Sequence, residues 1–143
     1  MKEYNNMVEH CFIDSNIWLY AFVESQDNNK LVLARATITN NVKAITVSSQ
    51  IINEVCVNLI KKANFSNEKI RKLIHNFYNK YNVIDLSQEV LIKASIVRDN
   101  HCFSFWDSLV VASALIADCE ILFSEDMQDN YLIENTRIIN PLL

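Results

Sequence analysis

Short apolar runs alternate with segments of helical periodicity along most of this chain, and that alternation restricts the fold more than any other feature. The apolar runs have the length and the β-branched content of buried strands. Strands that alternate with helices form a parallel sheet with helices on both faces. We therefore expect a three-layer α/β/α fold around a central parallel sheet of four to five strands. The expected strands cover residues 10–14, 44–47, 83–86, 120–123 and 137–139.

Helical periodicity is clearest in residues 50–63, where apolar side chains recur every four residues at Ile51, Val55 and Leu59. The segment SFWDSLVVASAL, which begins at Ser104, is apolar on nearly every side, so we expect it to pack between layers. A serine at the start can cap each of three helices. Four further helices are expected. Two cover residues 16–22 and 30–38, one begins after Ser66, and one runs from Ser87 to about Asp99.

Composition narrows the range of functions. The chain has 143 residues, and we expect residues 1–143 to form one domain with its own core. It contains no glycine. Because the phosphate-binding loop of ATPases and the dinucleotide-binding fingerprint both need glycine, those classes are disfavoured. In its absence, we expect asparagine to occupy left-handed backbone positions.

The sequence predicts a cytoplasmic protein without a membrane span. The N-terminal segment MKEYNNMVEH lacks the apolar stretch of a signal peptide, and no run is long enough to cross a bilayer. The net charge of −4 provides no overall attraction to nucleic acid, so such binding needs a local patch. We expect reduced thiols in the core at the four widely spaced cysteines, Cys11, Cys56, Cys102 and Cys119.

Four carboxylates stand at related places in the expected fold. Asp14 ends the first strand, and Asp126 lies just past the fourth. Asp107 begins a helix, and Glu54 lies about one turn inside the helix that follows the second strand. Sites in parallel α/β sheets form at the carboxyl ends of the strands. All four side chains can therefore lie at one edge of the sheet.

Each carboxylate also has a structural explanation. Asp14 can cap a helix, Asp107 and Ser104 have capping-box spacing, and Asp126 can be a turn residue. Glu54 can be a solvated helix residue, although no lysine or arginine stands three or four positions away. As a cluster, however, carboxylates raise one another's pKa unless a cation is present. Mg²⁺ or Mn²⁺, as one or two ions, suits these oxygen ligands and supports phosphodiester hydrolysis.

Four stretches resemble, in order, the acidic motifs of PIN-domain nucleases, and the similarity is closest to VapC-type toxins of type II toxin-antitoxin pairs. They are FIDSN at residues 12–16, the helix around Glu54, FWD at 105–107 and LFSED at 122–126. The resemblance continues to the ending IINP at 138–141. It implies a PIN-like fold and a metal-dependent endoribonuclease that leaves a 5′-phosphate and a 3′-hydroxyl. The implied holders of Mg²⁺ or Mn²⁺ are Asp14, Glu54, Asp107 and Asp126.

The resemblance also implies supporting residues and partners. Asn16 and Ser124 match positions that hold the carboxylates by hydrogen bonds. Proteins of this kind usually form homodimers, and a small VapB-like antitoxin inhibits them. The last motif departs from the family where glycine is usual, and there Asn130 can adopt the same backbone conformation.

A basic segment, KKANFSNEKIRK at residues 61–72, has two interpretations. It can contact RNA phosphates, or it can complement a helix end and keep a surface soluble. The aromatic side chains Trp18, Tyr20 and Phe22 favour core packing over stacking on RNA bases. The basic residues of this segment are Lys61, Lys62, Lys69, Arg71 and Lys72.

Two other functions fit the same residues: a stand-alone RNA-processing PIN nuclease, and a non-catalytic PIN module that binds RNA or protein. A short reading frame just upstream favours the toxin over the first alternative. The second offers no physical reason to keep four clustered carboxylates. A phosphotransfer receiver domain is disfavoured, because it needs an acidic pair at the first strand and a lysine after a late strand, and the sequence has neither.

Overall fold

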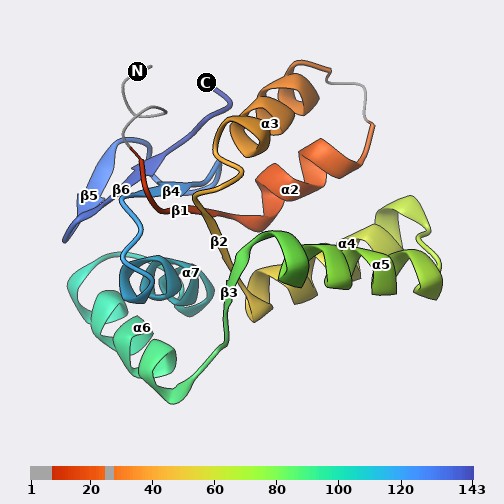
Figure 1. The fold of residues 1–143 in the computed structure, drawn as a ribbon. Helices are drawn as coiled ribbons and strands as arrows, with labels where there is room; N and C mark the ends of the chain where they lie inside the picture. Colours follow the sequence, from red (N-terminus) through yellow and green to blue (C-terminus); the bar gives the residue numbers. More distant parts are fainter. Residues whose placement is uncertain (1–7, 25–27) are drawn as a thin grey trace.

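The computed structural model describes residues 8–24 and 28–143. Its centre is a six-stranded sheet in the order β3, β2, β1, β4, β6, β5, shown in Figure 1. Neighbouring strands are parallel except β5 and β6, which are antiparallel. The predicted α/β architecture is therefore confirmed. The strands are β1 (Cys11–Ile13), β2 (Ile45–Ser48), β3 (Asn82–Ile84), β4 (Ile121–Phe123), β5 (Tyr131–Ile133) and β6 (Thr136–Ile139).

The six helices of the described residues are arranged in three pairs. Figure 1 shows α2 and α3 on one side of the sheet and α6 and α7 on the other, while α4 and α5 run beside each other away from it. Residues 108–114 of α7 are all buried, which confirms that this helix packs between layers. The helices are α2 (Ser15–Phe22), α3 (Asn28–Asn40), α4 (Ser49–Ala63), α5 (Asn67–Lys80), α6 (Gln88–Asn100) and α7 (Phe105–Ile116).

The structure corrects three expectations. The sheet has six strands, because β5 forms a hairpin with β6 that the sequence pattern did not indicate. The third strand ends at Ile84, so Asp85 and Leu86 lie beyond it. Three cysteines are buried free thiols as expected, but Cys102 is exposed in the loop between α6 and α7 and is not part of the core.

The serine residues in the sequence correctly predicted where three helices begin. Ser66, Ser87 and Ser104 are the N-cap residues of α5, α6 and α7, and each hydroxyl accepts a hydrogen bond from a backbone amide three residues later. Asn64 and Asn130 have positive φ angles, as expected in a chain without glycine.

Two expectations concern the chain's surroundings. None of the described helices has the length and apolar character needed to cross a membrane. The expected absence of a signal peptide concerns the N-terminal segment, of which residues 1–7 lie outside the described ranges.

Trp18 is 1% exposed and packs against Phe22, Phe77 and Tyr81, which confirms its place in the core.

Candidate active site

The strand order creates a topological switch point between β1 and β4. From β1 the chain continues to β2 and β3 on one side, whereas β4 and β6 lie on the other. Ligands of open α/β sheets bind at such a point, outside the carboxyl ends of the strands. Asp14 directly follows β1, and Asp126 follows β4 by three residues. Two predicted site residues therefore lie where this topology favours a site.

Asp14 is buried at that edge and is held by two hydrogen bonds. As the N-cap residue of α2, it accepts a bond from the Ser15 amide at 2.8 Å. Its Oδ2 accepts another from the Ser124 hydroxyl at 2.9 Å. Burial raises the pKa of Asp14 to about 6; these hydrogen bonds oppose the rise, and the charges of Glu54 and Asp107 add to it. A cation at this edge would therefore stabilise the ionised carboxylate.

Asp107 is the third residue of α7, one turn after the cap. Its amide donates a hydrogen bond to the Ser104 hydroxyl at 3.1 Å, which is one half of the expected capping box. Burial raises the pKa of Asp107, the charges of Asp126 and Glu54 raise it further, and the Ser104 hydroxyl lowers it. Asp107 is thus both part of a helix cap and electrostatically coupled to the other predicted acids.

Glu54 lies in the second turn of α4, the helix that follows β2. Its Oε1 accepts a hydrogen bond from the indole N–H of Trp106 at 3.1 Å. This bond joins α4 to the first turn of α7, next to Asp107. Four separate segments of the chain therefore contribute carboxylates to what we call the acidic site: Asp14, Glu54, Asp107 and Asp126.

Contacts from α2 and α3 hold the loop that carries Asp126. The side-chain amide of Asn16 donates a short hydrogen bond to Asp126 Oδ2. The preceding residue, Glu125, forms an ion pair of 2.6 Å with Lys30 and accepts a hydrogen bond from the Tyr20 hydroxyl at 2.8 Å. Asp126 is therefore positioned by a bond to its own carboxylate and by contacts to its neighbour Glu125.

The acidic site offers the oxygen ligands that a hard divalent cation prefers. Within residues 8–24 and 28–143, no three His, Cys, Asp or Glu side chains come together closely enough to hold a metal ion. Mg²⁺ commonly binds through one or two carboxylates and keeps several waters. The oxygen donors are therefore of the kind that Mg²⁺ or Mn²⁺ prefers, but the described carboxylates are not drawn together as three direct ligands.

The other predicted contact residues lie apart from the acidic site. Lys61 is seven positions after Glu54 in α4, which is about 10 Å along the helix axis. All five basic side chains are exposed, at the end of α4 and in α5. The structure brings them near one another on the α4–α5 pair, but it does not bring them to the acidic site. They are Lys61, Lys62, Lys69, Arg71 and Lys72.

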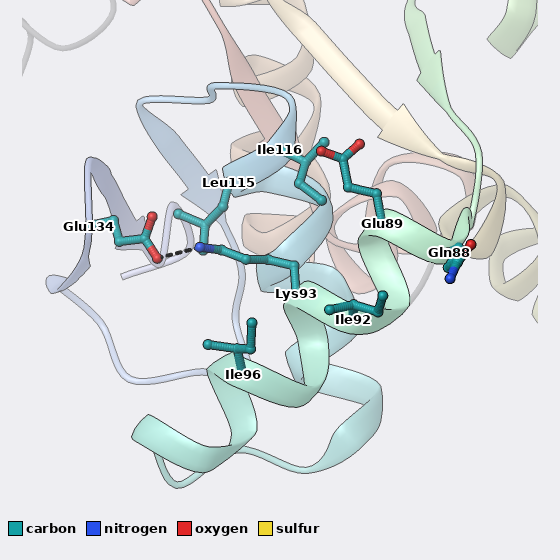
Figure 2. Close-up of a pocket in the computed structure, with 8 residues that line it drawn as sticks. All are labelled: Gln88, Glu89, Ile92, Lys93, Ile96, Leu115, Ile116 and Glu134. Atoms are coloured by element: carbon teal, nitrogen blue, oxygen red, sulfur yellow. Dashed lines mark hydrogen bonds and ion pairs between the residues drawn. The ribbon is translucent and has the colours of Figure 1, made fainter.

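A groove of about 560 Å³ lies elsewhere, between α6, α7 and the β5–β6 turn (Figure 2). Figure 2 shows Lys93 reaching across it to Glu134, an ion pair of 2.8 Å, above the apolar side chains of Ile92 and Ile96. Leu115, at the far end of α7 from Asp107, also lines it. This groove contains none of the predicted site residues, and its lining offers no carboxylate cluster.

Sequence reasoning missed three contributors around the acidic site. Trp106 was noted only as part of a motif, although its bond to Glu54 orients that carboxylate. Glu125 was noted only for its place in LFSED, although it holds the Asp126 loop through Lys30. Gln50 was not singled out; it is buried, and neither polar atom of its side chain has a hydrogen-bond partner within the described part of the chain. The one available signal was spacing, since Gln50 lies one turn before Glu54.

Comparison with known proteins identifies a family. The model of the PIN domain family matches residues 11–130. No curated protein sequence matches the chain. The fold is similar to that of Mycobacterium tuberculosis VapC20, described as a sarcin-ricin loop cleaving toxin, at a TM-score of 0.66 and 14% identity over 81% of this chain and 89% of that one.

Two further solved structures share the fold. A toxin-antitoxin complex from Klebsiella pneumoniae has a TM-score of 0.70 and 19% identity, over 92% of this chain and 97% of that one. DNA-bound VapBC from Salmonella typhimurium has a TM-score of 0.65 and 16% identity, over 90% and 96% respectively. At these identities the similarity establishes the arrangement of strands and helices.

Proposed function

Because this chain belongs to the PIN domain family, we propose that it is a metal-dependent endoribonuclease and the toxin of a type II toxin-antitoxin pair. The observation that supports the proposal is the acidic site, in which carboxylates from four segments are electrostatically coupled and Asp14 directly follows a strand at the switch point of the sheet. Such a group is electrostatically unfavourable without a cation. Phosphodiester hydrolysis is a reaction that needs this arrangement and no nucleophilic side chain.

Each residue has a role in this proposal. Mg²⁺ or Mn²⁺, as one or two ions, supplies Lewis acidity toward the phosphodiester. Asp14 and Asp107 hold the metal, and the helix N-termini at which they stand favour their ionised forms. Glu54 and Asp126 complete the negative charge of the acidic site. The hydrogen bonds from Ser124, Asn16 and Trp106 orient three of these four carboxylates.

The partners and setting belong to the same proposal. The solved relatives in complex with antitoxins support a VapB-like antitoxin as the inhibitor of this chain. We also propose that the chain forms a homodimer and that residues 1–143 form a single domain. A cytoplasmic location agrees with four free thiols, since reducing compartments keep cysteines unpaired. The basic side chains of residues 61–72 are available to contact RNA phosphates.

The test is cleavage of defined RNAs by the purified chain with Mg²⁺, with Mn²⁺ and with EDTA. We expect cleavage with either metal, none with EDTA, and none by Asp14→Asn or Asp107→Asn. Asp85→Asn is the matched control: Asp85 also directly follows a strand, β3, but it is exposed and lies outside the acidic site. Equal cleavage by all variants, or cleavage in EDTA, would contradict the proposal.

A second measurement is independent of activity. Because a cation relieves repulsion in the acidic site, Mn²⁺ should raise the Tm of the wild-type chain. The rise should be lost in Asp14→Asn and kept in Asp85→Asn. Coexpression with the product of an adjacent upstream reading frame then separates a toxin from a stand-alone nuclease, since only an antitoxin copurifies and suppresses cleavage.

A further inference from the structure

Trp106 combines wide exposure with a defined position beside the acidic site. Trp106 is 49% exposed, which is unusual for a residue with so large an apolar ring. Its indole N–H is nevertheless bound to Glu54 Oε1 at 3.1 Å, and the next residue in α7 is Asp107. Core packing, which explains Trp18, does not explain this ring.

We propose that Trp106 is an RNA-binding residue whose ring stacks on an unpaired nucleobase next to the acidic site. The proposal rests on the nuclease function above. It adds that an unpaired nucleobase is the part of the RNA substrate that this edge of the sheet recognises. Every nucleobase offers a π face to an aromatic side chain, so stacking is independent of base identity and of charge. The predicted preference is therefore for single-stranded over double-stranded RNA, because only unpaired bases are free to stack on a side chain.

The charge distribution favours stacking at this position. The chain has a net charge of −4, and the acidic site itself repels the phosphates of RNA. The nearest predicted basic contact in α4, Lys61, lies about 10 Å beyond Glu54 along the helix. An aromatic ring at the acidic site supplies affinity where local charge opposes binding.

The hydrogen bond to Glu54 gives the ring a defined direction. Rotation of the indole would break the bond to Oε1, so the ring keeps one edge toward α4 while about half of the residue stays open to solvent. A base stacked there would lie beside the carboxylates that hold the metal. Two substitutions separate these contributions: Trp106→Phe keeps an aromatic ring and removes the donor, and Trp106→Ala removes both.

The chain contains two tryptophans, which makes fluorescence a direct test. Trp18 is buried, so a change in emission on adding RNA reports on Trp106. The wild-type chain in EDTA, where cleavage is not expected, is titrated with a short single-stranded RNA and with the same ribose-phosphate chain without bases. We expect the RNA to quench the emission and the oligomer without bases to leave it unchanged.

Affinities of the variants follow from the anisotropy of fluorescently labelled RNA. Trp106→Ala should weaken binding roughly 5- to 150-fold, the range for stacking of one base on one aromatic side chain. Trp106→Phe should keep most of the affinity. Leu132→Ala is the matched control, because Leu132 is an apolar residue of similar exposure, 53%, in β5 and outside the acidic site.

The outcomes separate this inference from the proposed function. Equal RNA affinity of wild type and Trp106→Ala overturns the stacking, and RNA cleavage by both would leave the nuclease standing. An emission change that follows protein concentration instead of RNA assigns Trp106 to a contact between copies of the chain, and also overturns it. A wild-type chain that binds RNA through Trp106 but never cleaves it counts against the nuclease and not against the stacking.

Discussion

The hydroxyl of Ser124 donates a 2.9 Å hydrogen bond to Oδ2 of Asp14 and thereby joins the end of β4 to the end of β1. The contact follows from the sheet, because Ile13 and Phe123 are paired in register and Asp14 and Ser124 directly follow these two strand ends. This bond lowers the pKa of a carboxyl that burial raises to about 6.

Ser124→Ala should therefore make Asp14 harder to ionise. We expect cleavage near neutral pH to fall roughly 10- to 100-fold, the usual cost of removing a group that orients a metal ligand. The acidic limb of the pH–rate profile should move to higher pH. Ser113→Ala is the control, since its buried hydroxyl donates a hydrogen bond within α7, to the Leu109 carbonyl. An unmoved acidic limb in Ser124→Ala would show that the bond does not tune Asp14.

Asp14→Asn should abolish cleavage and stabilise the metal-free protein at neutral pH. The pKa of Asp14 is raised from 3.8 to about 6, so the folded state binds more protons than the unfolded state between these values. The free energy of unfolding of the wild type therefore falls as pH rises from about 4 to 6. At pH 7 the ionised group costs at most about 3 kcal/mol.

Urea unfolding in EDTA measures this effect. At pH 7 the Asn variant should be more stable than the wild type by about 1–3 kcal/mol, and the difference should vanish near pH 4. The Asn side chain can still accept from the Ser15 amide and donate to Ser124, so its packing is kept. A variant less stable than the wild type at pH 7 would mean that Asp14 is primarily a helix cap.

Ser104→Ala tests the joint role of the cap and the acid in α7. Loss of the cap should reduce the free energy of unfolding by about 1 kcal/mol, and Ser66→Ala and Ser87→Ala should cost a similar amount in their own helices. Ser104→Ala should also slow cleavage and Ser87→Ala should not, because Ser104 caps the helix turn that carries Asp107 of the acidic site. Asp107→Asn with normal cleavage and a lower Tm would leave Asp107 with the capping role alone.

Gln50→Met should stabilise the fold. Both polar atoms of the Gln50 side chain are buried without a partner in the described residues, and an unsatisfied buried amide costs about 1–3 kcal/mol. Methionine has a similar length and no such groups, so chemical denaturation should show a gain of about 1 kcal/mol or more. Gln88→Met, at an exposed position of α6, should change stability by less than about 0.5 kcal/mol. A loss of stability at position 50 would show that the amide is satisfied in solution.

The fold was largely predictable because its signals are local. Strand and helix periods, serine caps and the asparagines at left-handed positions are each read from a few neighbouring residues. Strand β5 was not predicted, because the turn between β5 and β6 has no glycine to mark it. Glu134 in that turn has a φ angle of 51°, a conformation that glutamate seldom adopts. Only pairing with β6 identifies residues 131–133 as a strand.

The acidic site was predictable as a set of residue types and not as a set of contacts. The residues around Asp14 predict that it follows a strand, and the residues around Asp107 predict that it follows a helix cap. That Trp106 would bind Glu54, or that Glu125 would pair with Lys30, depends on helices and loops that meet only after folding.

The sequence by itself determined the alternation of strands and helices and predicted four carboxylates near the carboxyl edge of the sheet, because both depend on local periodicity and on chain order. Tertiary structure decided which groups surround those carboxylates. Ser124 reaches Asp14 across 110 positions of sequence because β1 pairs with β4. Such a contact, and the pKa change that it brings, depends on strand pairing and burial, which no local pattern encodes.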